Sequence, residues 1–554
     1  MFGFKNSLTQ SVIFLLWILQ NFTSGSETLT CILTFLIYIN LVLCVLMYDY
    51  DYWVNRGVFS PPALPVVGHI GSVVAGKEQN GIFFKRIYDK YKDKRILGVH
   101  QFYRRTLVVC DPELIKRMCV NDFAHFTDRG FFFDREVDPL AESVLYLRGN
   151  EWKKLRAKIS PIFSPIKLKG MLPIIENTAK EFVQRIRKLL TNDKTKANTE
   201  SNDNKNNNND DNSTVVDSEE LVGRYTADAI VPCAFGVKSH VMDNPNDPFA
   251  VALGAFYELS FYNIFEKTMR HLWPTFVLFF KMRTIPKKTH DFFYNIVTNV
   301  IKDRKNGVQE KRGDFIDMMM ALRSEDKPEL EDKENDVKIT DMIIAANAFI
   351  IFLGGYETTS STLAFLFLEL ASHQDVQDKM RMEIKEVYQK YGKMSYEMLQ
   401  DLTYMDMVIQ EILRLYPPFP TIQRLCTKDY EIPGTDVVLQ KDTIVVFPTL
   451  GLHRDEKYFP DADSFRPSRW SGGAEGRLAA GVYSPFGDGP RYCVGKRFAL
   501  NQMKCCLVEL LSHLRVTPNK ESGTFAERTK PFEVNNRAPM TLHPADSKIA
   551  ISLL

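Results

Sequence analysis

A cysteine inside a stiff, glycine-rich loop near the C-terminus constrains this sequence more than any other feature. Residues 484–495 read SPFGDGPRYCVG, and a helix-compatible run begins directly after Cys493. Glycine lets a backbone approach a flat ligand closely, and proline stiffens a loop. The dipole of the following helix and the neighbouring Arg491 both favour the thiolate form of the cysteine. The loop therefore predicts a thiolate metal ligand, although a lone cysteine in such a loop is more often structural.

The periodicity of the remaining sequence predicts a mainly α protein. The chain has 554 residues, of which 45% are hydrophobic, and is long enough to bury a large core. Helical periodicity runs through residues 338–371, 375–391, 398–415 and 494–514, and short β-like runs cover 106–110, 430–432 and 443–447. Many helices with a few short strands, segregated along the chain, indicate an α-rich α+β architecture.

One segment of low complexity interrupts this pattern. Residues 191–218 are polar and poor in apolar side chains, and they include an Asn-rich run at 206–209. Such sequence buries too little surface to offset the entropy of ordering, so we expect a disordered surface loop. A domain boundary is the alternative, but the helical pattern continues on both sides. We therefore predict a single catalytic domain over residues 56–554.

Net charge and cysteine usage argue against two classes of protein. The formal net charge is +2, whereas nucleic-acid-binding proteins usually carry a strong basic excess, so we expect no nucleic-acid partner. The nine cysteines are odd in number and lack the spacing of a disulfide framework. We expect free thiols in a reducing compartment.

The first 55 residues differ in kind and predict a membrane anchor. Residues 29–48 contain no charge over about twenty positions, the length that spans a bilayer core. A shorter apolar run at 12–19 precedes them. That run fits either a cleaved signal peptide or one arm of a hairpin anchor. We favour a retained anchor, single-pass or hairpin, that holds the domain at a membrane.

The residues of the cysteine loop match a known pattern. Phe486, Gly489, Arg491, Cys493 and Gly495 are spaced as Phe-x-x-Gly-x-Arg-x-Cys-x-Gly. This is the haem-binding signature of the cytochrome P450 family, which the chain closely resembles from its proline-rich segment near residue 60 to the C-terminus. The resemblance implies the cytochrome P450 fold with an N-terminal transmembrane anchor. It also implies a haem b cofactor whose iron is bound by Cys493, with the other four residues forming part of the cofactor site.

Two further segments match the family's charged motif. Glu411 and Arg414 stand three residues apart on a predicted helix, and Arg469 follows within the sequence FRPSR. On its own, such a helical pair is a common surface pair worth a few tenths of a kcal/mol. The resemblance implies instead that the three side chains form a buried ion network behind the haem. Removing one partner would then leave a buried charge unpaired.

A third match lies in the long apolar helix, at Gly354, Gly355, Tyr356, Glu357 and Thr358. Two adjacent glycines destabilise a helix relative to alanine, so they need a reason, and close helix packing is the simple one. The resemblance implies that this segment crosses the distal face of the haem. Thr358 would then hydrogen-bond iron-bound oxygen, and Glu357 would relay protons. Both are expected to be catalytic residues.

Several basic residues are expected near the haem edge and its proximal face. By position in the family pattern, Trp152, Arg156, Arg424 and Arg491 contact the haem propionates. Core packing is the alternative for Trp152, and a solvated helix face is the alternative for Arg156. A wider basic cluster would dock an acidic redox partner. Its members are Lys153, Lys154, Arg156, Lys158, Lys496 and Arg497.

The resemblance implies a haem-thiolate monooxygenase that inserts one atom of O2 into a lipophilic substrate: a steroid, a fatty acid or a xenobiotic. Residues 223–228 (GRYTAD) look most like the broad-specificity animal enzymes that oxidise steroids and drugs. The sequence has no dinucleotide-binding fingerprint, so electrons would come from NADPH–cytochrome P450 reductase, with cytochrome b5 as a second candidate donor. The expected location is the endoplasmic reticulum membrane, with the catalytic domain in the cytosol. A haem-thiolate isomerase or dehydratase and a non-catalytic haem protein are the alternatives.

A set of phenylalanines predicts a roomy lipophilic pocket. We expect two or three of them to contact substrate, although core filling explains any single one equally well. The set comprises Phe123, Phe126, Phe131, Phe132, Phe133, Phe349, Phe352 and Phe419.

Overall fold

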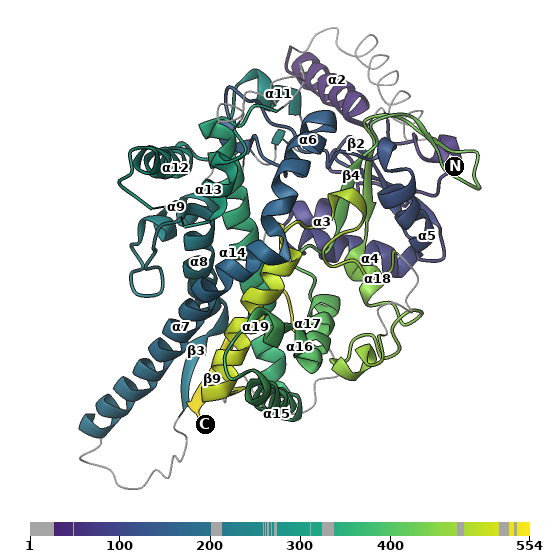
Figure 1. The fold of residues 1–554 in the computed structure, drawn as a ribbon. Helices are drawn as coiled ribbons and strands as arrows, with labels where there is room; N and C mark the ends of the chain where they lie inside the picture. The colour runs from purple at the N-terminus through teal and green to yellow at the C-terminus, as the bar shows by residue number, and fades with distance from the viewer. Residues whose placement is uncertain are drawn as a thin grey trace.

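The computed structural model describes residues 27–47, 49–200, 213–258, 274–310, 312–323, 337–473, 481–519, 531–536 and 540–554, together with a few positions between 260 and 270. Helices dominate this part of the chain, and its strands form three small sheets (Figure 1). The predicted mainly α fold is therefore confirmed.

The main helices are α2 (Glu27–Met47), α4 (Asn80–Tyr91), α6 (Gly149–Ile159), α7 (Pro165–Glu200), α8 (Ser218–Phe235), α9 (Pro248–Tyr257), α12 (Lys287–Lys305), α14 (Asp341–Ser372), α15 (Gln374–Tyr391), α17 (Thr403–Leu415) and α19 (Lys496–His513). Shorter helices are α3 (Gly71–Val74), α5 (Pro112–Lys116), α11 (Pro274–Phe279), α13 (Phe315–Met320), α16 (Tyr396–Asp401) and α18 (Thr449–His453).

Helix α14 forms the centre of the helical core. Its sequence is apolar nearly all round, as expected for a buried helix, and most of its side chains are buried. The helix begins after Thr340, whose hydroxyl accepts a hydrogen bond from the N–H of Ile343. Helices α8, α12, α17 and α19 pack against it (Figure 1). By length and composition, α14 is the one described helix suited to crossing a bilayer, but its burial identifies it as a core helix.

The strands lie in three separate sheets. The largest has the order β1-β2-β7-β4, in which β1 (Ile96–Gln101) and β2 (Arg104–Val109) form an antiparallel hairpin. Strand β7 (Ile444–Phe447) runs parallel to β2 and antiparallel to β4 (Ile422–Leu425). The second sheet has the order β3-β9-β8, with β3 (Ser213–Asp217), β9 (Lys548–Leu553) and β8 (Leu514–Pro518) all antiparallel. Strands β5 (Tyr430–Glu431) and β6 (Val438–Leu439) form the third.

Most elements expected from periodicity are present within one to three residues of their predicted bounds, but the helix predicted at 398–415 is two helices. Helix α16 ends at Asp401 and α17 begins at Thr403. The carboxylate of Glu383 on α15 accepts hydrogen bonds from the N–H groups of Tyr404 and Met405, at 2.6 and 2.9 Å. These bonds satisfy the first free donors of α17, so a helix start is stabilised there by a residue from another helix.

The Asn-rich segment is shorter than predicted. Helix α7 extends to Glu200, and β3 begins at Ser213, so both ends of the segment 191–218 carry secondary structure. Strand β3 forms because it pairs with β9 in antiparallel register, Ser213 opposite Ser552. Residues 201–212, which include the Asn-rich run, lie outside the described residues.

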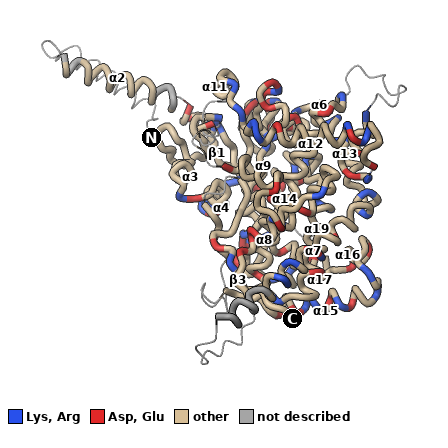
Figure 2. Tube along the Cα trace, turned by 90° about the vertical axis from the view of Figure 1, so that its left-hand side faces the viewer, with Lys and Arg blue, Asp and Glu red and all other residues tan. Residues whose placement is uncertain are grey.

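Helix α2 covers most of the predicted anchor and exposes apolar side chains. Phe35 is 63% exposed and Tyr38 is 65% exposed, although both belong to residue types that folded proteins usually bury. Figure 2 shows α2 extending away from the rest of the protein. The described apolar part, Cys31–Leu43, is shorter than a bilayer-spanning segment, and the first apolar run at 12–19 lies outside the described residues.

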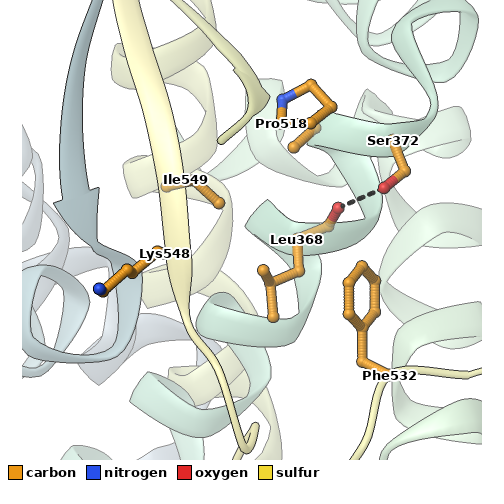
Figure 3. A pocket seen from close by; sticks show the side chains of 7 residues that line it. Leu368, Ser372, Pro518, Phe532, Lys548 and Ile549 are labelled. Atoms are coloured by element: carbon orange, nitrogen blue, oxygen red, sulfur yellow. Dashed lines mark hydrogen bonds between the residues drawn. The ribbon is translucent and has the colours of Figure 1, made fainter. Parts of the chain in front are cut away.

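A small apolar hollow lies between the end of α14 and strands β8 and β9 (Figure 3). Its lining includes Leu368, Ser372, Pro518, Phe532 and Ile549, and its volume is about 140 Å³. Pockets for drug-sized ligands are roughly 300–1,000 Å³, so this hollow is too small to be the functional site.

Candidate active site

The cysteine loop is closed by its own backbone. The N–H of Cys493 donates to the carbonyl of Phe486 at 2.8 Å, and the N–H of Tyr492 donates to the carbonyl of Gly489 at 2.9 Å. Gly489 has a φ of +68°, and a Cβ at this position would lie 1.8 Å from the carbonyl oxygen of Cys119. Glycine is therefore required there by backbone angle and by space.

The thiol of Cys493 lies just before the N-terminus of α19, as predicted. Burial raises its pKa above the ordinary value of 9.0, while the N–H of Gly495 and the charges of Arg129, Arg156 and Lys496 act to lower it. Burial has the larger effect, so the isolated thiol keeps its proton. A metal cation bound to sulfur replaces that proton, and the surrounding positive groups then favour the thiolate.

Four guanidinium groups gather around this loop, from Arg129, Arg156, Arg424 and Arg491. Burial, followed by repulsion from the other three, lowers the pKa of Arg491 to about 8. Burial and the repulsion of Arg424 and Arg156 lower that of Arg129 to about 9. Arg424 is 2% exposed, and its Nε is buried with no hydrogen-bond partner among the described residues. Such a cluster suits a ligand with more than one anionic group.

Arg491 joins the cysteine loop to helix α6. Its guanidinium lies 3.9 Å from the ring centre of Trp152, which is 3% exposed. It also donates to three backbone carbonyls, of Thr127 at 2.7 Å, Val144 at 3.2 Å and Leu147 at 2.8 Å. These contacts hold the Trp152 ring beside the cysteine loop, and they orient Arg491 by packing as well as by hydrogen bonding.

Val144 connects this loop to helix α14. Its carbonyl accepts from Arg491, and its N–H donates to the side-chain oxygen of Asn347 at 2.9 Å. Asn347 is fully buried on α14 and donates in turn to the carbonyl of Ile343 at 2.7 Å. One residue thus carries hydrogen bonds to both the cysteine loop and the long helix, which fixes their separation.

Thr358 and Gly354 lie one turn apart on α14 beside open space. The hydroxyl of Thr358 donates to the carbonyl of Gly354 at 2.5 Å. A Cβ at Gly354 would meet no atom within 4 Å, whereas one at Gly355 would lie 2.9 Å from the side chain of Ile230. The second glycine is therefore explained by close helix packing, and the first borders a space that a ligand can enter.

The carboxylate of Glu357 is held by three side chains from other elements. The hydroxyls of Tyr257 and Thr541 each donate to it, and the ring of His543 lies 3.7 Å from Oε1. Burial acts to raise the pKa of Glu357, but bonds from His543, Thr541 and Tyr257 outweigh burial and hold that pKa below its ordinary value of 4.5. Glu357 is therefore ionised at neutral pH and fixed in orientation.

Comparison with known proteins decides the family. The family model described as "Cytochrome P450" matches residues 59–539. The chain belongs to the cytochrome P450 family. It is 31% identical over 506 residues to cytochrome P450 6j1 of Blattella germanica, covering 90% of this chain and 94% of the relative. It is also 32% identical over 474 residues to probable cytochrome P450 6a14 of Drosophila melanogaster, covering 84% and 89%.

Membership gives the chemical class of this P450. Members of the family are haem-thiolate monooxygenases, so the chain is an oxidoreductase that uses haem. The residues present fit that cofactor: a half-buried thiol just before a helix N-terminus, a cluster of guanidiniums with an unpartnered buried nitrogen, and a glycine that leaves space on α14. The residues that sequence reasoning assigned to the cysteine loop and to α6 are brought together.

The predicted ion network of the P450 chain is present. Arg414 donates to both carboxylate oxygens of Glu411, at 2.9 and 2.8 Å, and Arg469 donates to the same carboxylate at 2.9 Å. Both Glu411 and Arg414 are fully buried. The ring nitrogen of Trp470 and the N–H of Arg466 complete the set of donors, at 2.9 Å each. The surface-pair alternative is therefore excluded.

Three of the predicted pocket phenylalanines fill the core instead. Phe349 and Phe352 are 2% and 0% exposed, and both pack against Phe293, with ring centres 4.8 and 5.5 Å away. Phe126 is also fully buried and lies edge-on to Tyr430. The apolar periodicity of a core helix and a Phe-rich lining look alike in sequence. Substrate contacts at the remaining positions stay predictions: Phe123, Phe131, Phe132, Phe133 and Phe419.

Sequence reasoning missed two groups of residues. Arg129 and Asn347 hold the cysteine loop and α14, and neither belongs to a motif. Tyr257, Thr541 and His543 bind Glu357 from segments 100 to 186 residues away along the chain. The only local signal was the position of Arg129 in the loop before Trp152, where a cation beside an expected haem edge is a candidate partner for a propionate.

Proposed function

We propose that this P450 inserts one oxygen atom from O2 into a lipophilic substrate, using electrons from NADPH delivered by a separate reductase. The observation that carries the proposal is that one protein combines a cysteine site for haem with an acid–alcohol pair. The thiol of Cys493 lies near the charges of Arg129 and Arg156, and the Glu357–Thr358 pair on α14 borders open space. A haem protein that only binds a ligand has no need of an ionised, oriented carboxylate beside a hydroxyl.

The proposed cofactor is haem b, held by residues of the cysteine loop and α6. Cys493 would bind the iron, and the propionates would pair with Arg129, Arg156, Arg424 and Arg491. Bound haem supplies the iron that activates oxygen, and the thiolate donates electron density to it. Trp152 keeps the guanidinium of Arg491 in place, and the glycines at 487, 489 and 495 keep the loop backbone free of side chains.

Glu357 and Thr358 are the proposed catalytic residues. Glu357 is ionised at neutral pH, so it can accept a proton and pass it on. The hydroxyl of Thr358 lies one turn from Gly354, beside open space, and donates to the Gly354 carbonyl. With haem bound, this hydroxyl and the Glu357 carboxylate would be the groups of this chain that hold and pass on protons for the reaction.

Replacing Thr358 with alanine should uncouple the reaction. Thr358→Ala removes the proposed proton-passing hydroxyl, so more of the NADPH consumed would yield hydrogen peroxide in place of oxidised substrate. We expect the product formed per NADPH to fall about tenfold, with a matching rise in peroxide. Thr359→Ala is the matched control, because the Thr359 hydroxyl is buried with no hydrogen-bond partner among the described residues. Equal coupling in the two variants would contradict the role of Thr358.

Electrons are proposed to enter on the cysteine side of the P450. Arg156 on α6 donates to the carbonyl of Tyr492 at 2.9 Å, which places the basic residues of α6 beside the cysteine loop. Lys153, Lys496 and Arg497 are exposed there. A cationic surface near Cys493 suits an acidic electron donor, and NADPH–cytochrome P450 reductase and cytochrome b5 are the proposed donors.

A location at the endoplasmic reticulum membrane, with the catalytic domain in the cytosol, is proposed from the N-terminal helix. The exposed apolar side chains of α2 are expected to lie in lipid rather than water. Phe279 and Phe280, 80% and 59% exposed, add a second apolar surface at the end of α11. Figure 1 shows α11 and α2 at the same end of the molecule, so both can meet one bilayer.

Cofactor dependence tests the proposal. Full-length protein reconstituted in lipid vesicles with NADPH–cytochrome P450 reductase should oxidise at least one of three probes: a steroid, a fatty acid and an aromatic ether. Product should require reductase, NADPH and O2 together. Conversion of an organic peroxide without reductase or NADPH would favour the isomerase or dehydratase reading. No NADPH-dependent product from any probe would contradict the monooxygenase.

A further inference from the structure

Glu357 is joined to the surface of helix α8 by an unbroken line of polar atoms. On the α8 side, Oε1 of Glu219 lies 2.7 Å from Nδ1 of His543. The opposite ring nitrogen of His543 lies 2.9 Å from the hydroxyl of Thr541, and that hydroxyl donates to Oε1 of Glu357. The contacts of Thr541 with His543 and Glu357 are hydrogen bonds, whereas His543 and Glu219 are joined as an ion pair and the Nδ1 atom makes no hydrogen bond of good geometry.

Exposure falls along the line from Glu219 to Thr541, and the side chain of Glu357 at its end is 20% exposed. The side chain of Glu219 is 36% exposed, that of His543 is 15% exposed, and Thr541 is 1% exposed as a residue. Helices α8 and α14 lie side by side, so the line crosses directly from one to the other through the C-terminal loop (Figure 1). A proton taken up at Glu219 therefore reaches Glu357 through one ion-pair contact and two hydrogen bonds.

The loop that carries Thr541 and His543 is pinned to α14. The hydroxyl of Ser361, one turn after Glu357, donates to the carbonyl of Leu542. The N–H of Leu542 donates to the carbonyl of Pro418 at 3.0 Å. Both the carbonyl and the N–H of Leu542 are therefore hydrogen-bonded. These bonds hold the neighbouring Thr541 and His543 in place beside Glu357.

We propose that Glu219, His543 and Thr541 form a proton-relay chain that supplies Glu357 from solvent on the α8 side. His543 and Thr541 are positioning residues in this scheme, since they act on the reaction through Glu357. The inference rests on the proposed function, because a supply of protons to Glu357 matters only if Glu357 delivers them in turnover.

The relay moves one proton per step. The O–H bond of Thr541 breaks as its proton bonds to Oε1 of Glu357, and the Nε2–H proton of His543 bonds to the oxygen of Thr541. His543 is left neutral and is reprotonated from solvent through the carboxyl group of Glu219. The net change is one proton moved from water to Glu357, with Thr541 and Glu219 returned to their starting states.

The charges facing His543 support its role as the proton store. Burial acts to lower the pKa of His543, but its contacts with Glu219 on α8 and Glu357 on α14 outweigh burial and raise it from 6.5 to about 9. Burial and the charges of Glu357 and Glu219 raise the pKa of Tyr356 on α14, and burial and the charge of Glu357 raise the pKa of Tyr257 on α9. His543 is therefore protonated at neutral pH, and the stability its charge contributes is lost as pH rises through about 9.

Three substitutions test the relay in full-length protein with reductase. Thr541→Val keeps the shape of the side chain and breaks the line, whereas Thr541→Ser keeps the hydroxyl. With 7-ethoxycoumarin as probe, product per NADPH should fall about tenfold in Thr541→Val and stay near wild type in Thr541→Ser. His543→Gln should resemble Thr541→Val. Glu220→Gln is the matched control, since Glu220 is exposed on the same turn of α8 and outside the line.

A second oxygen source separates proton supply from folding and haem binding. Iodosobenzene delivers an oxygen atom without needing protons, so Thr541→Val and wild type should form product from it at the same rate. Thr541→Val should also show a larger solvent isotope effect with NADPH. Equal NADPH coupling in Thr541→Val and wild type would overturn the relay, as would an equal loss with both oxygen sources.

Titration of His543 tests its contact with Glu219 independently of catalytic turnover. In protein carrying isotope-labelled histidine, the signal lost in His543→Gln should titrate near pH 9, and Glu219→Gln should move that midpoint toward 6.5. An unchanged midpoint would overturn the Glu219–His543 contact. If wild type makes no product from either oxygen source, the proposed function fails. The titration alone then decides whether Glu219 and His543 form the ion pair.

Discussion

Arg414→Ala should lower the free energy of unfolding by about 3–5 kcal/mol, the cost of stranding one partner of a buried ion pair. Arg414 is fully buried, and its guanidinium donates to Glu411, to the carbonyl of His453 at 2.9 Å and to that of Ala462 at 2.5 Å. In the alanine variant these buried acceptors lose their hydrogen-bond donor, and the surrounding protein does not supply another. Urea unfolding, followed by circular dichroism and by haem absorbance, measures the change.

Arg466→Ala is the matched control for this prediction. The side chain of Arg466 pairs with Asp461 at 2.8 Å, but the two are 44% and 65% exposed. Surface pairs contribute about 0–1 kcal/mol, so we expect a small change. The backbone N–H of residue 466, which donates to Glu411, remains in the variant. A loss of stability in Arg414→Ala no larger than in Arg466→Ala would contradict the buried network.

The same network fixes how stability depends on acid. Burial acts to raise the pKa of Glu411, but Arg414, Arg469 and the N–H of Arg466 outweigh burial and hold it below 4.5. The contribution of Glu411 is therefore present above pH 4.5 and is lost as pH falls below that value. Arg414→Ala should lose most of its extra destabilisation in the same acidic range.

The parts of the site that were predicted correctly are motifs whose residues lie close together in the sequence. The cysteine loop spans residues 484–495, and Glu411 and Arg414 stand one helical turn apart. Spacing of this kind determines geometry within a loop or a helix, so the motif and its arrangement come together. The long helix α14 was predicted well for a related reason, because its apolar sequence is sustained over many turns.

The parts that sequence did not predict depend on partners far away in the chain. Strand β3 (STVVD) pairs with β9, and nothing in residues 213–217 alone names that partner. The break between α16 and α17 is stabilised by Glu383 of α15. His543 reaches Glu357 only through the path of the C-terminal loop. None of these contacts could be predicted from local sequence, because each joins segments that are brought together only by the fold.

Cys493→Ala should abolish the red-shifted Soret band that reduced, thiolate-ligated haem gives with carbon monoxide. The thiol of Cys493 lies under the guanidinium cluster and at the start of α19, so its removal takes away the only proposed bond from this loop to iron. A methyl group cannot bind a metal. We expect complete loss of the band, with helix content by circular dichroism close to that of wild type.

Cys110→Ala controls for the loss of a buried thiol elsewhere. Cys110 is 5% exposed and belongs to the core around the β1–β2 hairpin, and burial raises its pKa to about 12, as expected for a thiol that serves only packing. This variant should keep the full band.

The reduced carbon-monoxide difference spectrum of wild type, Cys110→Ala and Cys493→Ala tests the central claim most directly. We expect the thiolate band in wild type and in Cys110→Ala and no such band in Cys493→Ala. A folded Cys493→Ala protein that retained the band would show that another residue binds the iron, and it would contradict the site described above.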